Sequence, residues 1–186
     1  MISIPIDQFA EALRRASDWH KVNEEHDSRV KVMCLQIGTA LQLSPEALES
    51  LGVTALLHDV GRLGIDDNII AKPGRLTKAQ TAAMRTHSQI GYEIVNGILP
   101  KEICDGILYH HENYDGTGYP GGLSGNAIPL FARIIAIIDR WDALTNDRPY
   151  RAALSYANAL HIMNMQVSYF DPQIYTEFLK IIREQR

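Results

Sequence analysis

The chain has 186 residues and a mass of 20.9 kDa; 46% of its residues are hydrophobic, 22% are charged, and its formal net charge is −4. This composition is typical of a globular protein and excludes disordered, collagen-like and low-complexity classes. The acidic balance argues against binding to duplex nucleic acid, and no apolar run approaches the roughly 20 residues of a membrane span. We expect residues 1–186 to form a single domain.

Apolar residues at helical spacing predict a succession of helices. Ser44 followed by Pro45 is typical of a helix start, and Thr77 with Gln80 predicts a capping box. The expected helices cover 6–22, 30–41, 44–59, 77–94, 101–112, 130–144, 155–167 and 171–186, with 1–21 contributing a single N-terminal helix. No alternating strand pattern is visible. The sequence therefore predicts an all-α fold, a compact bundle of seven or eight helices.

One long loop and two cysteines complete the pattern. Residues 113–129 contain five glycines and two prolines in 17 residues, which predicts a glycine-rich loop, and long loops of this kind are often functional. Cys34 and Cys104 both lie in apolar helical patterns. We expect them to be buried, reduced thiols of a cytoplasmic protein.

Histidine is the notable residue type, with seven in the chain. Five histidines and two aspartates lie on predicted helices that also carry an apolar stripe: His26, His58, Asp59, His87, His110, His111 and Asp139. His58-Asp59 ends an apolar run, so Asp59 is expected to point inward, where an unpaired carboxylate is costly. His110-His111 can share one ion only near a helix end, because neighbouring residues diverge by about 100°.

A single inward histidine is more often an ordinary core residue than a ligand, and one acid in an apolar helix can simply cap a neighbour. The combination of seven such residues, with two adjacent pairs, favours a metal site. Mixed nitrogen and carboxylate donors suit iron, manganese or nickel better than calcium. The absence of cysteine from the set argues against a structural zinc site.

Several motifs in order carry a resemblance to a known family. The segment 58–65, HDVGRLGI, resembles the HD signature of metal-dependent phosphohydrolases, and 110–120, HHENYDGTGYP, resembles the second signature of the HD-GYP subfamily. Residues 72–77, 128–139 and 142–151 also look like that subfamily. The resemblance covers roughly residues 20–180.

The resemblance implies a metal-dependent phosphodiesterase that hydrolyses a cyclic dinucleotide, most often cyclic di-GMP, to linear pGpG or GMP with a metal-bridging hydroxide. It implies two ions: one held by His26, His58, Asp59 and Asp139, the other by Asp59, His87, His110 and His111. Asp59 would bridge them, and such pairs serve in-line attack on phosphodiesters. Some members bind a third metal through a glutamate at the position of Val22, so we expect two.

The resemblance also implies substrate residues. Many members have lysine at the position of Arg62, which would meet a substrate phosphate. Tyr119 would stack on a base or, alternatively, brace the loop. Arg148 and Arg151 match positions that contact the dinucleotide, and a solvated helix cap is the alternative explanation for them. Asp142, one turn after Asp139, would orient a ligand or Arg62.

Two other functions remain open. Arg62 in place of lysine favours a catalytically weak or inactive module that binds the nucleotide or a diguanylate cyclase, and a regulatory domain in trans would also fit so short a chain. A hydrolase for another phosphoester is the third reading, which the glycine-rich loop weakens. A membrane partner is not expected.

Overall fold

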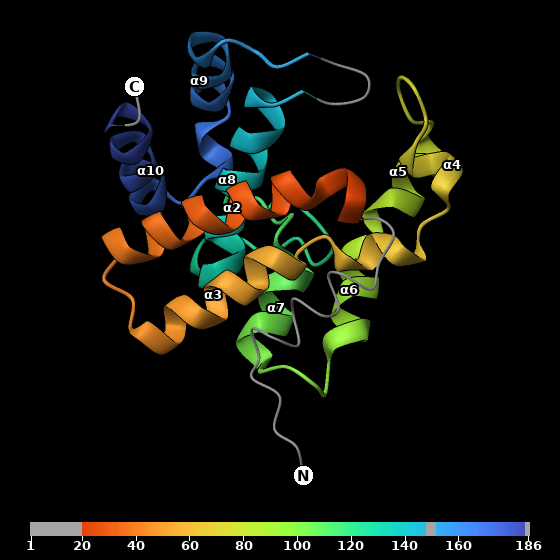
Figure 1. Ribbon diagram of the computed structural model, residues 1–186, viewed down its shortest axis with the longest axis horizontal. Helices are drawn as coiled ribbons and strands as arrows, with labels where there is room; N and C mark the ends of the chain where they lie inside the picture. The colour runs from red at the N-terminus through yellow and green to blue at the C-terminus, as the bar shows by residue number, and fades with distance from the viewer. Residues whose placement is uncertain (1–19, 148–151, 185–186) are drawn as a thin grey trace.

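The computed structural model describes residues 20–147 and 152–184, with side chains from residue 25 onward. The helices in chain order are α2 (His20–Ala40), α3 (Pro45–Leu57), η1 (Val60–Gly64), α4 (Asp67–Ile70), α5 (Lys78–Arg85), α6 (His87–Val95), α7 (Lys101–Tyr109), η2 (Gly125–Ala127), α8 (Leu130–Thr145), α9 (Tyr156–Met165), η3 (Val167–Tyr169) and α10 (Pro172–Glu184). Figure 1 shows their arrangement.

The predicted all-α class is confirmed. Eight of the described helices have eight residues or more, α4 has only four, and the described ranges contain no strand. Of the helix expected over 6–22, residues 6–19 lie outside the described residues, and 20–22 belong to α2. Cys34 and Cys104 are buried and form no disulfide, as expected. Within the described ranges, no helix combines the length and hydropathy needed to cross a bilayer.

Local sequence signals placed two helix starts correctly. The Ser44 hydroxyl accepts a hydrogen bond from the Ala47 amide, and Pro45 opens α3. At α5, the Thr77 hydroxyl accepts from the Gln80 amide while the Gln80 side chain accepts from the Thr77 amide. Both arrangements satisfy amides that a helix start leaves without intrahelical partners.

Three helix boundaries differ from the expectation. The helix predicted to start at residue 30 already runs from His20. Its first described buried residues, His26 and Asp27, are polar, so the apolar stripe begins only at Val30. The helix predicted over 77–94 is two helices, since Thr86 ends α5 by donating its hydroxyl to the Ala83 carbonyl. Finally, α7 ends at Tyr109, so His110 caps it.

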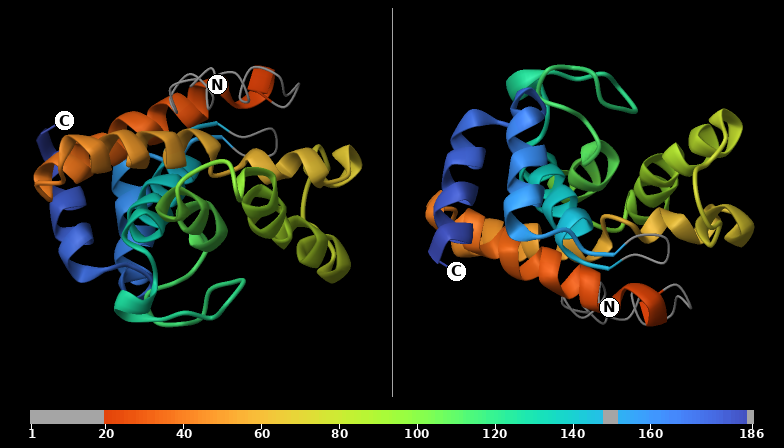
Figure 2. Two further views of the ribbon diagram at one scale, coloured as in Figure 1. Left: turned by 90° about the horizontal axis from the view of Figure 1, so that it is seen from below. Right: turned by 90° about the horizontal axis from the view of Figure 1, so that it is seen from above.

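The core is organised around α8, whose sequence is apolar on almost every side. One cluster joins α8 to α2, α3, α9 and α10, with Phe178, Ile134 and Ile138 fully buried. A second cluster joins α3 and η1 to α6 and α7 through Leu57 and Ile107. Figures 1 and 2 show α9 and α10 on one side of the molecule and α4 and α5 on the other, with the 113–129 loop on the face opposite α2.

Candidate metal centre

Among the described residues, two groups of side chains could each hold a metal ion, and Asp59 belongs to both. The first group contains Asp59, His87, His110 and His111, and the second contains His26, His58 and Asp59. Within each group the ligand atoms lie within 4.8 Å of one another. Asp139 lies beside the second group, so the structure brings all seven candidate ligands together from α2, α7, α8, the start of α6 and the α3–η1 junction.

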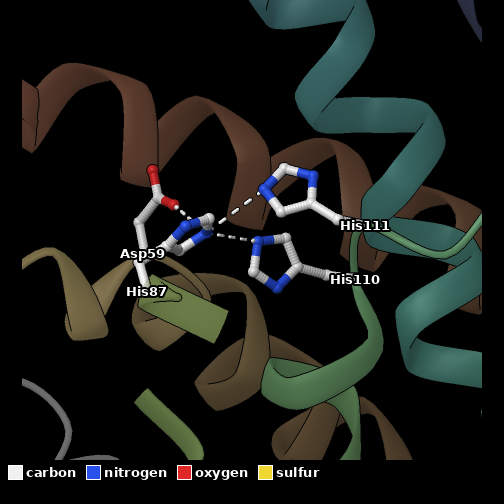
Figure 3. A group of neighbouring side chains, drawn as sticks. All are labelled: Asp59, His87, His110 and His111. Carbon is white, nitrogen blue, oxygen red and sulfur yellow. Dashed lines mark hydrogen bonds and ion pairs between the residues drawn. The ribbon is translucent and has the colours of Figure 1, made fainter. Parts of the chain in front are cut away.

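The first group is centred on His87 (Figure 3). Its Nε2 atom lies 3.2 Å from Nε2 of His110 and 3.2 Å from Nε2 of His111. It also lies 3.4 Å from Oδ1 of Asp59. Two donors at right angles around an ion about 2.1 Å away would be about 3 Å apart, so these spacings fit donors that share one ion.

The second group is held together across α2, α3 and α8. Nε2 of His26 lies 3.4 Å from Oδ1 of Asp139, and Nε2 of His58 lies 4.0 Å from the same oxygen. Nε2 of His58 is also 3.7 Å from Oδ2 of Asp59. The two oxygens of Asp59 therefore face different groups, with Oδ1 toward His87 and Oδ2 toward His58.

Backbone carbonyls orient three of the histidines in the same way. The Nδ1 atoms of His58, His87 and His110 lie 2.8, 2.7 and 2.6 Å from carbonyl oxygens three residues earlier. A carbonyl can only accept, so each Nδ1 carries the proton and each Nε2 keeps its lone pair for a ligand. All three residues lie at helix ends, where such carbonyls are free to accept.

Gly61 allows η1 to lie directly against the start of α6. A Cβ atom at this position would lie 1.8 Å from the His87 carbonyl oxygen and 2.4 Å from the Gly91 amide nitrogen. Only glycine permits so close an approach of two backbones. This contact brings Asp59 beside His87.

The surroundings of the first group shift its pKa values toward the protonation states that metal ligands need, namely neutral histidines and an ionised aspartate. Burial, reinforced by neighbouring histidines, lowers the pKa of His110 to about 3 and holds the pKa of His111 well below its usual value. Burial also lowers the pKa of His87. For Asp59, burial acts to raise the pKa, but Arg62 and the histidines outweigh it and hold the pKa well below its usual range. The histidines are neutral and Asp59 is ionised at neutral pH.

Unsatisfied buried atoms support a metal at this site. Nε2 of His26, Nε2 of His58 and Oδ1 of Asp59 are buried and form no hydrogen bond with any described residue. Leaving a buried donor or acceptor without a partner costs about 1–3 kcal/mol, more for a charged group. Because all three atoms point into the candidate centre, the residues present fit a bound cation.

Asp142 orients His26. Its Oδ2 atom lies 2.6 Å from Nδ1 of His26, and its Oδ1 atom accepts from Nε of Arg29 at 2.6 Å. Burial lowers the pKa of His26, but the hydrogen bond to Asp142 and the charge of Asp139 raise it more, so the net shift is upward. Sequence reasoning missed both Arg29 and the buried Asp27, whose pKa burial raises to about 6. Arg29 follows His26 by three residues and so shares its helix face, which was the available signal for Arg29.

Arg62 lies beside the carboxylate that both groups share. Its Nη2 atom is 2.8 Å from Oδ2 of Asp59, one helical turn earlier, and 22% of its side chain is exposed. The expected partner of Arg62 was a substrate phosphate. In the structure its cation faces Asp59.

The glycine-rich loop is anchored by Glu112, a buried residue that sequence reasoning did not single out. Its carboxylate accepts hydrogen bonds from the amides of Gly121 and Leu123. The ring of Tyr119 stacks on His111 with centroids 4.9 Å apart, and Arg85 lies over the same ring at 4.8 Å. These contacts match the loop-bracing role considered for Tyr119.

A cavity of about 610 Å³ opens beside the centre. Its lining includes His110, His111, Tyr119 and Asp139, together with Arg85. The candidate ligands therefore border a space large enough for a ligand. Arg148 and Arg151, two expected substrate residues, lie outside the described residues, and so does the side chain of Val22.

Comparison with known proteins gives the family. The HD domain family matches residues 13–174. The cyclic di-GMP phosphodiesterase response regulator RpfG of Xanthomonas campestris is 41% identical over 148 residues, which cover 77% of this chain and 39% of RpfG. The 3′3′-cGAMP-specific phosphodiesterase 1 of Vibrio cholerae is 37% identical, covering 77% of this chain and 34% of that protein. The chain thus spans between one third and two fifths of the length of these curated relatives.

Solved structures share the fold at lower identity. An HDGYP protein from Bdellovibrio bacteriovorus superposes with a TM-score of 0.71 at 19% identity, covering 95% of this chain and 57% of the other. A cyclic GMP-AMP specific phosphodiesterase of V. cholerae gives a TM-score of 0.65 at 22% identity, covering 86% of this chain and 44% of the other. From the family match and the helical fold around the His-Asp pair, this chain belongs to the HD domain family and is of the HD-GYP type.

Proposed function

We propose that the chain is a metal-dependent phosphodiesterase that hydrolyses a cyclic dinucleotide, with cyclic di-GMP as the first candidate substrate. The observation that carries the proposal is the pair of donor groups that share Asp59 at the edge of a cavity. The names of the similar proteins support the substrate class, since they include both cyclic di-GMP and 3′3′-cGAMP phosphodiesterases. Cyclic di-GMP is a bacterial second messenger, so the reaction would take place in the cytoplasm.

Two divalent transition-metal ions fit the donors. His26, His58, Asp59 and Asp139 would hold one ion, and Asp59, His87, His110 and His111 the other. Nitrogen donors mixed with carboxylates favour iron or manganese, with nickel as a further candidate. When bound, such a pair supplies Lewis acidity toward a phosphodiester and lowers the pKa of water.

The side chains of this chain prepare the site before any substrate arrives. Proton donation from Nδ1 to backbone carbonyls fixes the orientation of His58, His87 and His110. Asp142 does the same for His26. Because these bonds lie within or between packed helices, the donors need little reorganisation on binding, which is a condition for efficient electrostatic stabilisation.

Substrate contacts would come from cations around the cavity. Arg85 lines the cavity and lies over Tyr119, where it would face the negative charge of a phosphodiester. Arg62 would meet a phosphate if it left Asp59, and Arg148 and Arg151 remain proposed dinucleotide contacts. Guanidinium groups suit this role because they bind phosphate oxygens in pairs.

Incubation of metal-loaded protein with cyclic di-GMP tests the function. We expect linear pGpG, GMP or both, detected by chromatography, and no product after chelation. The same assay with 3′3′-cGAMP compares the two substrate classes. Absence of product from both dinucleotides, with two ions bound per chain, would contradict the proposal.

The contact between Arg62 and Asp59 favours a second function. An arginine cation 2.8 Å from the shared carboxylate competes with metal ions for the same oxygen. The chain would then be a binding module for a cyclic dinucleotide, acting on a diguanylate cyclase or on a regulatory domain in trans. Arg62→Lys distinguishes the functions, because a gain of activity in this variant would show that arginine restrains the wild-type centre.

A further inference from the structure

A helix face with two small residues forms one wall of the cavity beside the metal centre. Ala136, Asp139, Arg140 and Ala143 follow the spacing i, i+3, i+4, i+7 on α8, and all four line the cavity. Residues at this spacing share one face of a helix. Arg140 is therefore placed next to the candidate ligand Asp139, and the alanines leave room in front of it.

The guanidinium of Arg140 is held by two neighbours. Its Nε atom donates to Oε1 of Gln166 at 2.8 Å, and its Cζ atom lies 5.4 Å from the centroid of the Tyr169 ring. Within the described ranges, its two Nη groups form no hydrogen bond or ion pair. The end of the guanidinium thus presents paired donors, and its orientation is already fixed.

Apolar side chains line the cavity near this cation. Leu144, Ile162 and Phe170 contribute to the lining along with Tyr169. A phosphate would lose hydration beside these groups, whereas the faces of a nucleobase would bury apolar surface against them. The surroundings of Arg140 therefore favour a base over a phosphate.

Paired donors from an arginine match one base edge in particular. Guanine presents O6 and N7, two adjacent acceptors, while adenine presents N7 beside the N6 amino group, which is a donor. An arginine that meets adenine in the same pose would place donor against donor. The fork of Arg140 would therefore discriminate between the two purines.

We propose that Arg140 binds the O6/N7 edge of one guanine of the cyclic dinucleotide, with Gln166 and Tyr169 as positioning residues. This inference rests on the proposed function and deepens it, because it names a residue that sets base preference. It assigns the part of the cavity that Arg140 lines to a guanine base, and not to the phosphate that is cleaved.

Calorimetric binding with hydrolysis-resistant phosphorothioate analogues of cyclic di-GMP and cyclic di-AMP tests the inference on metal-loaded protein. Wild type is expected to prefer the guanine analogue. Arg140→Ala should weaken its binding by roughly tenfold to a hundredfold and change binding of the adenine analogue little. Arg140→Lys should lose the preference as well, since lysine keeps the charge but lacks the fork.

Three further variants complete the test, one as a control for charge and two to test the positioning role of Gln166. Arg183→Ala removes an exposed positive charge from α10 and should leave both affinities unchanged. Gln166→Glu keeps an acceptor for Nε and should keep the guanine preference, while Gln166→Leu should reduce it. A merely structural role for Gln166 would change protein stability without changing the preference.

Several results would overturn the inference: no guanine preference in wild type, an equal loss for both analogues in Arg140→Ala, or full rescue by Arg140→Lys. An equal loss would assign Arg140 to a phosphate. Failure of the proposed function is distinguishable, because the binding measurement needs no turnover. Protein that binds the guanine analogue through Arg140 but releases no product would keep this inference and refute the enzyme.

Discussion

Asp59 has the most exacting role of any single residue in the candidate centre. Its two oxygens face different histidine groups, and Arg62 contacts one of them. A carboxylate can serve two cations at once, whereas an imidazole Nε2 has one lone pair and serves one. Substitutions at Asp59 and at a histidine should therefore differ in how many ions they remove.

We predict that Asp59→Ala loses both ions while His26→Ala loses one. Elemental analysis after reconstitution under reducing conditions should give close to two ions per chain for wild type, about one for His26→Ala and almost none for Asp59→Ala. Circular dichroism of each variant establishes that the helices remain. If Asp59→Ala retained one tightly bound ion, Asp59 would not be the shared ligand.

At the scale of elements, the centre is built mainly from helix ends. His58 caps α3, His87 begins α6, and His110 caps α7. Helix ends leave backbone groups free, and three of these groups orient the histidine rings. The position of each end relative to its neighbour is therefore as important as the ligand itself, and Gly61 sets one such position.

Gly61→Ala is predicted to damage the site through the backbone alone. The new Cβ atom would lie 1.8 Å from the His87 carbonyl oxygen, so η1 and α6 must separate. We expect a loss of about 1–3 kcal/mol or more in the free energy of unfolding, and weaker metal binding. Urea denaturation and metal titration measure the two effects.

Gly52 offers a matched control inside α3. A Cβ atom there would meet the flexible end of Lys31 at 3.3 Å and no backbone atom. Gly52→Ala should be neutral or stabilising, because alanine favours the helix by about 0.5–1 kcal/mol. If Gly52→Ala and Gly61→Ala lowered stability and metal binding equally, the contact between η1 and α6 would not be the cause of the loss in Gly61→Ala.

At the scale of the whole molecule, folding brings several ionisable groups together at the candidate metal centre and shifts their pKa values. Three histidines, the buried His87 and His110 and the half-buried His111, have pKa values lowered by desolvation. Two groups act in the opposite direction, since His26 and Asp27 have raised pKa values. The dependence of stability on pH is the balance of these shifts.

For His110 the sign can be followed directly. Between pH 6.5 and about 3 the unfolded chain binds a proton at this residue and the folded chain does not. Stability from this residue therefore falls as pH falls through that window, by about 1.4 kcal/mol per pH unit. In metal-free protein, the free energy of unfolding of the His110→Gln variant should therefore fall less steeply with decreasing pH than that of wild type. The difference in slope should be about 1.4 kcal/mol per pH unit.

Urea denaturation of chelator-treated protein at a series of pH values between 7 and 4 measures this slope. His161→Gln is the control, because His161 is exposed on α9, and it should keep the wild-type slope. Identical slopes for wild type and His110→Gln would contradict the burial of a neutral imidazole.

Much of this protein could be predicted from its sequence by local rules. The starts at Ser44 and Thr77 follow from side chains that satisfy nearby amides, and the apolar character of 130–144 predicts a buried central helix. The His58-Asp59 and His110-His111 pairs stand out because polar ligands interrupt apolar runs. Such signals depend on neighbours within one element, so they need no knowledge of packing.

The tertiary structure decided which of these residues meet. Asp142 orients His26 across 116 positions of sequence, and Arg140 is fixed by Gln166 from a different helix end. Arg62 faces Asp59 rather than open solvent, and Glu112 anchors a loop nine residues further on. Sequence spacing determines distances only within a helix, whereas contacts between helices depend on how their apolar faces pack. The sequence by itself therefore determined the donors and the helices, and packing decided how those donors are grouped and oriented.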